Sequence, residues 1–227
     1  MGTGGSNLGA KALINILQGK EKIKIIFFDN IDPIGFQNSI NKIDISNAGF
    51  IVISKSGSTP ETLSQFSSLI EIFEKKNNLS KFFKNTLIIT ENKENPLYQI
   101  GLANKCTIVE HDSNIGGRYS VFSNVGMIPA IIAGLDVKQI QAGALSFVKD
   151  KNSMECLKIG KLFCYQNFNS KLTNTVLMTY SDALFYFGKW YLQLWAESIG
   201  KNNKGITAIH SVGTTDQHSQ LQLYLDG

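Results

Sequence analysis

The sequence has 227 residues, of which 43% are hydrophobic and 18% are charged, as is typical of a globular protein. Its formal net charge of +4 is spread along the chain, and no basic run indicates a nucleic-acid partner. No apolar run approaches the roughly 18 residues of a membrane span, and the N-terminus lacks the pattern of a signal peptide. We therefore expect a cytoplasmic protein with no nucleic-acid or membrane partner.

The chain contains three cysteines, an odd number that lacks the spacing of metal ligands: Cys106, Cys156 and Cys164. We expect them to be reduced thiols, as is usual in the cytosol. The cysteine pattern therefore predicts neither a disulfide framework nor a metal site.

Short apolar runs alternate with longer helical patterns in the first part of the chain. The alternation predicts strands near 24–28, 50–54, 86–90 and 106–110, and helices near 7–18, 33–42, 60–76 and 95–103. The strands are continuously apolar, which is typical of a parallel sheet covered by helices on both faces. We predict a doubly wound, parallel α/β domain over residues 1–133.

The pattern changes in the second part of the chain. Residues 119–168 are expected to be mainly helical, with a break at Gly134 and Asp136. Then follow a strand at 174–180, a helix at 182–200, a strand at 206–210 and a helix from Thr214. We predict a helical connection and an incomplete second α/β domain over 134–227. The glycine turn at the start normally follows a strand, so we expect the chain to be an interior piece of a longer protein.

The segment SKSGSTPET, residues 54–62, follows a predicted strand and contains a favoured helix-starting residue, Pro60. Helix N-termini at the carboxyl ends of parallel strands bind anions. Gly57 lets the backbone approach an anion closely, and four side chains can donate hydroxyl hydrogen bonds: Ser54, Ser56, Ser58 and Thr59. One hydroxyl would suffice to cap the helix, so the segment predicts a phosphate-binding loop.

The segment GTGGSNLGAK matches neither of two nucleotide-binding motifs. Asn7 stands where a dinucleotide fingerprint needs its third glycine, and Ala10 and Lys11 do not complete a Walker loop. The segment is either a tight strand-to-helix turn or a turn that lets a ligand approach Gly4, Gly5 and Ser6.

Arg118 is the only arginine among 22 basic residues, and it follows Gly116 and Gly117. A planar, permanently charged, bidentate donor at this point favours a functional contact with an anion, although a surface arginine on a turn is the alternative.

Gln193, Glu197 and Lys201 recur every four residues on one face of the helix expected at 182–200. Glu197 is either half of an exposed ion pair with Lys201 or a catalytic base with Gln193 beside it. His218 follows Asp216 and Gln217 near the start of the last predicted helix. It is either only a helix-start residue or an imidazole that would suit proton transfer on a sugar phosphate.

Five motifs, in chain order, resemble the glucose-6-phosphate isomerase family: GTGGSNLG, SKSGSTPET, GGRYSVFSNVG, QLWAES and GTTDQHSQ. The resemblance covers nearly the whole chain. It implies two sugar-isomerase (SIS) domains, each a flavodoxin-like α/β sandwich. It also implies the reversible conversion of glucose 6-phosphate to fructose 6-phosphate, a step of glycolysis and gluconeogenesis.

The resemblance also implies roles for individual residues. The phosphate would be bound by Ser54, Ser56, Thr59 and the backbone of Lys55, and the sugar would lie beside Gly4 and Ser6. Glu197 would move a proton between C2 and C1 through a cis-enediol, with Arg118 near the enediolate and Gln193 positioning the substrate. His218 would assist ring opening across the interface of a homodimer. No hydride moves, so no cofactor is expected.

The family is longer than this chain, and its C-terminal part includes a lysine-bearing segment that also assists ring opening. Two alternatives to an active isomerase therefore stay open: a non-catalytic phosphosugar-binding module and an inactive, truncated isomerase. A third possibility is an active isomerase of broader specificity, which also accepts mannose 6-phosphate.

Overall fold

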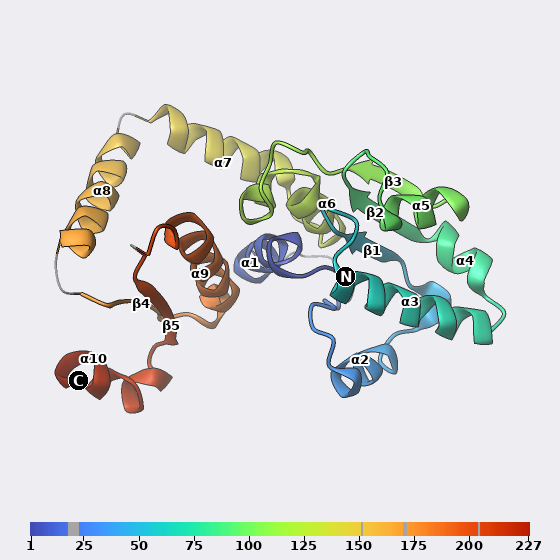
Figure 1. Ribbon diagram of the computed structural model, residues 1–227, viewed down its shortest axis with the longest axis horizontal. Coiled ribbons are helices and arrows are strands. Elements are labelled where there is room, and N and C mark those ends of the chain that lie inside the picture. The colour runs from blue at the N-terminus through green and yellow to red at the C-terminus, as the bar shows by residue number, and fades with distance from the viewer. Residues whose placement is uncertain (18–22, 151, 170–171, 204) are drawn as a thin grey trace. The chain divides into compact units, whose positions relative to one another are not determined.

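The computed structural model describes residues 1–17, 23–150, 152–169, 172–203 and 205–227 (Figure 1). It divides into two compact units. The first comprises Met1–Ala10 and Glu21–Ala133, and the second comprises Lys11–Lys20 and Gly134–Gly227. Each unit has a parallel sheet. Within the described ranges, no helix combines the length and the apolar character that a membrane crossing requires.

The first unit has a three-stranded parallel sheet in the order β1-β2-β3. Its strands are β1 (Phe50–Ile53), β2 (Thr86–Thr90) and β3 (Thr107–Glu110). Its helices are η1 (Gly4–Ser6), α2 (Pro33–Ile40), η2 (Ile45–Asn47), α3 (Pro60–Lys75), α4 (Leu79–Lys84), α5 (Pro96–Ala103), η3 (Gly117–Phe122) and α6 (Asn124–Ile132). The residues of α1 (Leu8–Leu17) are shared between the units.

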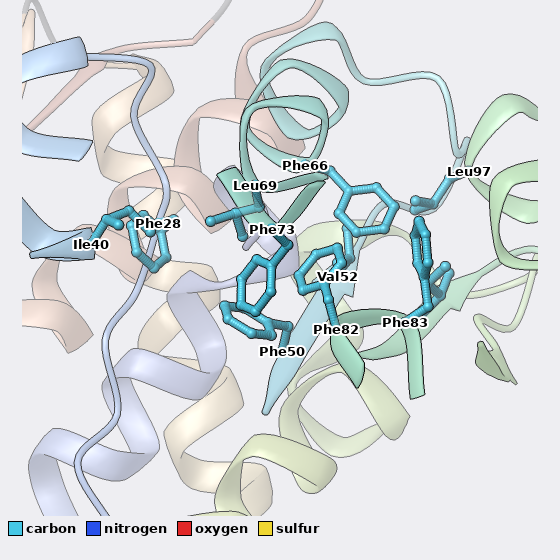
Figure 2. Close-up of a cluster of buried hydrophobic side chains, with 11 residues drawn as sticks. Phe28, Ile40, Phe50, Val52, Phe66, Leu69, Phe73, Phe82, Phe83 and Leu97 are labelled. Carbon is cyan, nitrogen blue, oxygen red and sulfur yellow. The ribbon is translucent and has the colours of Figure 1, made fainter. Parts of the chain in front are cut away.

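Both faces of this sheet are buried at β1 and β2. On one face, Val52 and Ile88 pack in a cluster with aromatic and aliphatic side chains of α3 and α4, among them Phe66, Leu69, Phe73 and Phe82 (Figure 2). On the other face, Ile53 and Ile89 pack against Val125 of α6. Successive residues of a strand point to opposite faces, so a sheet buried on both sides needs uninterrupted apolar strands. The predicted α/β fold class with a parallel sheet is confirmed.

Residues 24–28, predicted as a strand, belong to no strand in the described part of the chain. The amide of Gly2 donates to the carbonyl of Phe28 (3.1 Å), and the amide of Ile53 donates to the carbonyl of Met1 (2.9 Å). The backbone of Met1 and Gly2 therefore lies between β1 and Phe28. The strand prediction was wrong because a hydrogen bond at Phe28 does not make a ladder along the segment. Its apolar side chains instead join the core, where Phe28 is buried.

The second unit contains a parallel pair of strands, β4 (Asn174–Thr179) and β5 (Thr207–Val212). They are connected by η4 (Asp182–Leu184) and α9 (Phe185–Ile199), and the indole N–H of Trp195 on α9 donates to the carbonyl of Ile206 (3.0 Å). The remaining helices are α7 (Val137–Lys149), α8 (Ser153–Asn169), η5 (Thr215–His218) and α10 (Leu221–Asp226). These elements confirm the predicted strands and the long helix between them.

The predicted break between helices is confirmed, with Asp136 as the N-cap of α7. Its Oδ1 accepts from the amide of Lys138 (3.0 Å), because the first amides of a helix have no partner within the helix. Sequence analysis missed α4, a short helix just before β2. The last residue of the helix predicted at 7–18 lies outside the described residues, as does the side chain of Cys164. Cys106 and Cys156 are free thiols.

Candidate functional site

The hydroxyl-rich loop of residues 54–59 connects the end of β1 to α3. Ser54 is 2% exposed, and its amide continues the sheet by donating to the carbonyl of Ile89 (3.0 Å). Its hydroxyl lies 2.8 Å from that of Thr59 and accepts from the amide of Gly57 (3.1 Å). The hydroxyl of Ser58 donates to that of Ser56 (3.1 Å), and both residues are exposed. The loop thus presents its hydroxyls as two hydrogen-bonded pairs at the start of a helix, where anions are favoured.

Gly57 allows this loop to pack against the start of α5. Its φ of +65° is in the left-handed region, and a Cβ there would lie 1.7 Å from Oδ1 of Asn95. Asn95 is the N-cap of α5, where its Oδ1 accepts from the amide of Tyr98 (2.8 Å). Its Nδ2 also donates to the carbonyl of Lys93 (3.0 Å). The α5 cap therefore helps to fix the shape of the hydroxyl loop.

The side chain of Lys55 points from this loop to the loop after β3. Its ammonium donates to the carbonyls of Ser113 (2.7 Å) and Ile115 (3.0 Å). It also lies 3.8 Å from Oε1 of Glu91, at the end of β2. A hydrogen bond from Lys93 lowers the pKa of Glu91, and the charges of Lys93 and Lys55 act in the same direction against the opposing effect of burial.

Arg118, in η3, is half-buried, and its guanidinium carbon lies 4.4 Å from the centroid of the Tyr119 ring. The glycine turn packs directly against this segment, since a Cβ on Gly5 would lie 2.2 Å from the carbonyl carbon of Gly117. The hydroxyl of Ser120 also donates to the carbonyl of Gly5 (3.2 Å). These contacts hold the glycine turn beside the Arg118 segment.

The first unit therefore joins three segments near the carboxyl end of its sheet: the glycine turn, the hydroxyl loop and the Arg118 loop. They carry seven of the predicted site residues, namely Gly4, Ser6, Ser54, Lys55, Ser56, Thr59 and Arg118. Hydroxyls, free helix amides and a guanidinium are the donors that suit a phosphate or another oxyanion.

The second unit carries the remaining three predicted residues. On α9, Nε2 of Gln193 donates to Oε1 of Glu197 (2.8 Å), and Glu197 is exposed. Oε1 of Gln193 is buried and has no hydrogen-bond partner among the described residues. His218 is exposed at the end of η5, on a separate element after β5. The structure therefore brings Gln193 and Glu197 together, and presents His218 elsewhere.

The model of the family described as phosphoglucose isomerase matches residues 1–227. The chain belongs to the phosphoglucose isomerase family. The probable glucose-6-phosphate isomerase of Methanococcus maripaludis is 39% identical over 239 residues, which cover all of this chain and 53% of that protein. The chain spans about half the length of the curated relatives it matches.

Two solved structures have a similar fold. A hypothetical protein of Thermus thermophilus has a TM-score of 0.88 and 27% identity, over 100% of this chain and 56% of that one. A glucose-6-phosphate isomerase of Chlamydia trachomatis has a TM-score of 0.78 over 97% of this chain and 46% of that one. At 23% identity, the second likeness shows the fold alone.

Sequence analysis of this phosphoglucose isomerase family member did not single out the residues that support the site. Asn95 and Glu91 are both buried beside the hydroxyl loop. The Asn–Pro pair at the start of α5 signals a helix cap, which could have identified Asn95. No local signal marks Glu91, because its role depends on lysines from two different loops.

Sequence analysis did not single out His210, which lies on β5. Its Nε2 lies 3.0 Å from the hydroxyl of Thr179, and its ring packs so closely on α9 that a Cβ on Gly188 would lie 2.2 Å from Nε2. Burial lowers the pKa of His210, the charge of Lys189 lowers it further, and Asp216 opposes both effects. The ring therefore favours its neutral form, as a packing residue between β5 and α9.

Proposed function

We propose that this chain forms the active-site core of a glucose-6-phosphate isomerase, which interconverts glucose 6-phosphate and fructose 6-phosphate. The observation that carries the proposal is the convergence of the hydroxyl loop and the Arg118 loop at one edge of the first unit's sheet. A phosphate held by Ser54, Ser56, Thr59 and the Lys55 backbone is remote from the reacting carbons. Its binding energy can therefore orient the sugar, beside Gly4 and Ser6, for reaction.

In the proposed mechanism, Glu197 moves a proton between C2 and C1 through a cis-enediol. A positioned general base contributes about 10²- to 10⁴-fold to such a step. The hydrogen bond from Gln193 supports this role, because it restrains the orientation of the Glu197 carboxylate. Arg118 supplies positive charge to the developing enediolate, where it stabilises the transition state more than the ground state. The substrate undergoes no net oxidation or reduction, because one of C1 and C2 is oxidised as the other is reduced.

A Glu197→Gln variant tests the role of the base. We expect turnover of fructose 6-phosphate, measured by coupling glucose 6-phosphate formation to its dehydrogenase, to fall at least about 100-fold. The dissociation constant of fructose 6-phosphate, measured by calorimetry, should change little. Glu155→Gln, an exposed substitution on α8, is the matched control and should leave both quantities unchanged. Retained turnover in Glu197→Gln would remove Glu197 from the mechanism.

A non-catalytic phosphosugar-binding module is the second candidate. It is favoured by the position of every proposed phosphate-binding residue in the first unit. Assay of the 227-residue chain separates the two functions: binding of fructose 6-phosphate without turnover supports the module or a truncated isomerase, and turnover excludes both. Turnover of mannose 6-phosphate in the same assay would reveal a broader specificity.

We also propose that the protein acts in the cytoplasm as a homodimer in which His218 assists ring opening in the partner's site. The exposure of His218 at the end of η5 supports a role toward another molecule. Mixing the separately inactive Glu197→Gln and His218→Ala variants under conditions of subunit exchange should restore part of the activity. No recovery after verified exchange would count against a shared site.

A further inference from the structure

We infer that the side chain of Lys55 is a positioning group, which fastens the loop carrying Arg118 to the phosphate-binding loop. The inference rests on the proposed function, because that function requires both loops to act on one substrate. The Lys55 ammonium then bonds to other groups of the protein, and the phosphate is bound by hydroxyls and backbone amides.

Most of the hydrogen-bonding capacity of the Lys55 ammonium is already occupied. An ammonium has three N–H donors, and two of them are directed at the carbonyls of Ser113 and Ile115, at 2.7 and 3.0 Å. The Glu91 carboxylate, 3.8 Å away and with a side chain only 10% exposed, supplies the opposing charge. A phosphate bound by Lys55 would compete with these acceptors and would leave a buried carboxylate with less compensation.

The backbone end of Lys55 is held by β2. Its carbonyl accepts from the amide of Glu91 (3.1 Å) and from the hydroxyl of Thr90 (3.4 Å). The preceding residue, Ser54, is bonded to β2 through its amide. The side chain therefore extends from a fixed point on the sheet.

The loop that bonds to the Lys55 ammonium is a compact turn closed by Asp112. The Oδ1 of Asp112 accepts from the amide of Asn114 (2.8 Å), and the carbonyl of Asp112 accepts from the amide of Ile115 (3.2 Å). His111, at the base of the turn, is 2% exposed, and its amide donates to the carbonyl of Thr90 (2.8 Å). These hydrogen bonds connect the residues of the turn to one another, so the bonds from Lys55 to two of its carbonyls restrain the turn.

Arg118 lies three residues after Ile115, whose carbonyl accepts from Lys55. The intervening Gly116 and Gly117 have no side chains, so the position of Arg118 depends on the packing of Gly117 against Gly5 and on contacts to either side of the two glycines. The hydrogen bond from Ser120 to Gly5 provides the later anchor. Lys55 provides the earlier one, through charge-assisted hydrogen bonds that are stronger than neutral ones.

The test compares Lys55→Met with two matched variants. Lys93→Met removes the other cation that pairs with Glu91, but Lys93 makes no bond to residues 113–115 in the described structure. Lys55→Arg keeps a charged donor that can reach the same carbonyls. The readouts are amide hydrogen exchange across residues 112–119 and the dissociation constant of fructose 6-phosphate measured by calorimetry.

We expect Lys55→Met to speed exchange of the Asn114, Ile115 and Tyr119 amides by about tenfold or more, as for loss of a hydrogen bond to a charged group. Lys93→Met should leave this exchange unchanged, and Lys55→Arg should restore at least part of the protection. The dissociation constant should change less than about threefold, because the phosphate ligands are intact. If Lys55→Met does not fold, Lys55→Gln gives the same comparison without the charge.

The functional part of the inference is tested against Arg118. Lys55→Met should lower the kcat for fructose 6-phosphate far more than it raises KM, and it should have no further effect in an Arg118→Ala background. Unchanged loop exchange in Lys55→Met would overturn the inference. If fructose 6-phosphate also bound about tenfold more weakly, Lys55 would be a direct phosphate ligand. If the unmodified chain binds no sugar phosphate, the proposed function fails, while loop exchange still decides whether Lys55 fastens the loop.

Discussion

The two units present their candidate site residues in contrasting ways. In the first unit, Ser54 is buried, its hydroxyl bridges two loop positions, and a side chain from another helix cap contacts Gly57. In the second unit, Glu197 and His218 are exposed, and the hydrogen bond from Gln193 restrains Glu197. An anion site benefits from donors that are fixed before the ligand arrives, whereas a proton carrier must remain accessible to its substrate. Substitutions at Ser54 and Gly57 should therefore act mainly on stability and binding, and substitutions at Glu197 and His218 mainly on turnover.

The largest expected effect on stability is that of Gly57→Ala. The left-handed φ and the contact with Asn95 together should lower the free energy of unfolding by about 2–4 kcal/mol. Phosphosugar binding should be lost with the loop shape. Urea denaturation and calorimetry with fructose 6-phosphate measure the two effects. Gly49→Ala, where the nearest atom to the new Cβ is 3.7 Å away, is the control. Normal stability and binding in Gly57→Ala would contradict a preformed loop.

Ser54→Ala should have the next largest effect. It removes a buried hydroxyl that bonds to Thr59 and Gly57, which should lower the free energy of unfolding by about 1–2 kcal/mol. Loss of the oriented hydroxyl pair should weaken fructose 6-phosphate binding about tenfold or more. Ser67→Ala, an exposed substitution on α3, should change neither quantity. A Ser54→Ala protein that binds as well as the original would exclude this hydroxyl as a phosphate ligand.

The two units should also differ in their response to acid. The pKa of His210 is lowered on folding, so the unfolded state binds more protons below the ordinary histidine pKa of about 6.5. Its contribution to stability is complete above that pH and is lost as the pH falls below it. The pKa of Glu91 in the first unit is also lowered on folding, so the stability it contributes is present above about pH 4.5 and is lost as the pH falls through its folded pKa.

Hydrogen exchange followed from about pH 8 to about pH 5, corrected for the intrinsic exchange rates, can detect this difference. The β4 and β5 amides should lose protection below about pH 6.5, and His210→Gln should reduce that loss. The β1 and β2 amides should keep their protection over the same range. If the β4 and β5 amides lost as much protection in His210→Gln as in the unmodified chain, a group other than His210 would cause the loss.

The smallest expected effect is a gain in stability from Gly143→Ala on α7. No atom lies within 4 Å of the new Cβ, so the substitution removes the entropic cost of a helical glycine without a clash. We expect the free energy of unfolding to rise by about 0.5–1 kcal/mol, measured by urea denaturation. Loss of stability would indicate a packing role for this surface. A rise in the free energy of unfolding for Gly143→Ala and a fall for Gly57→Ala would show that the structure requires glycine at position 57 but not at position 143.

The elements that were predicted correctly depend on local sequence patterns, and those that were not depend on contacts with distant parts of the chain. The strands at β1 and β2 were predictable because each is an apolar run followed by helix-starting residues. Residues 24–28 have the same apolar character, yet they form no strand, since a strand also requires a neighbouring backbone along its length. The short helix α4 was missed because its tertiary packing, through Phe82 and Phe83, stabilises it more than its local pattern does.

The sequence by itself determined the parallel α/β class, the hydroxyl loop at the end of β1 and the family to which the chain belongs. These features depend on local chemistry: apolar runs, a proline at a helix start, and hydroxyls within six residues of one another. Only the tertiary structure decided the partners of Lys55 and the contact between Gly57 and Asn95. Those contacts join residues that lie 38 to 60 positions apart in the sequence, and no local pattern encodes which distant carbonyl or side chain the fold brings within reach.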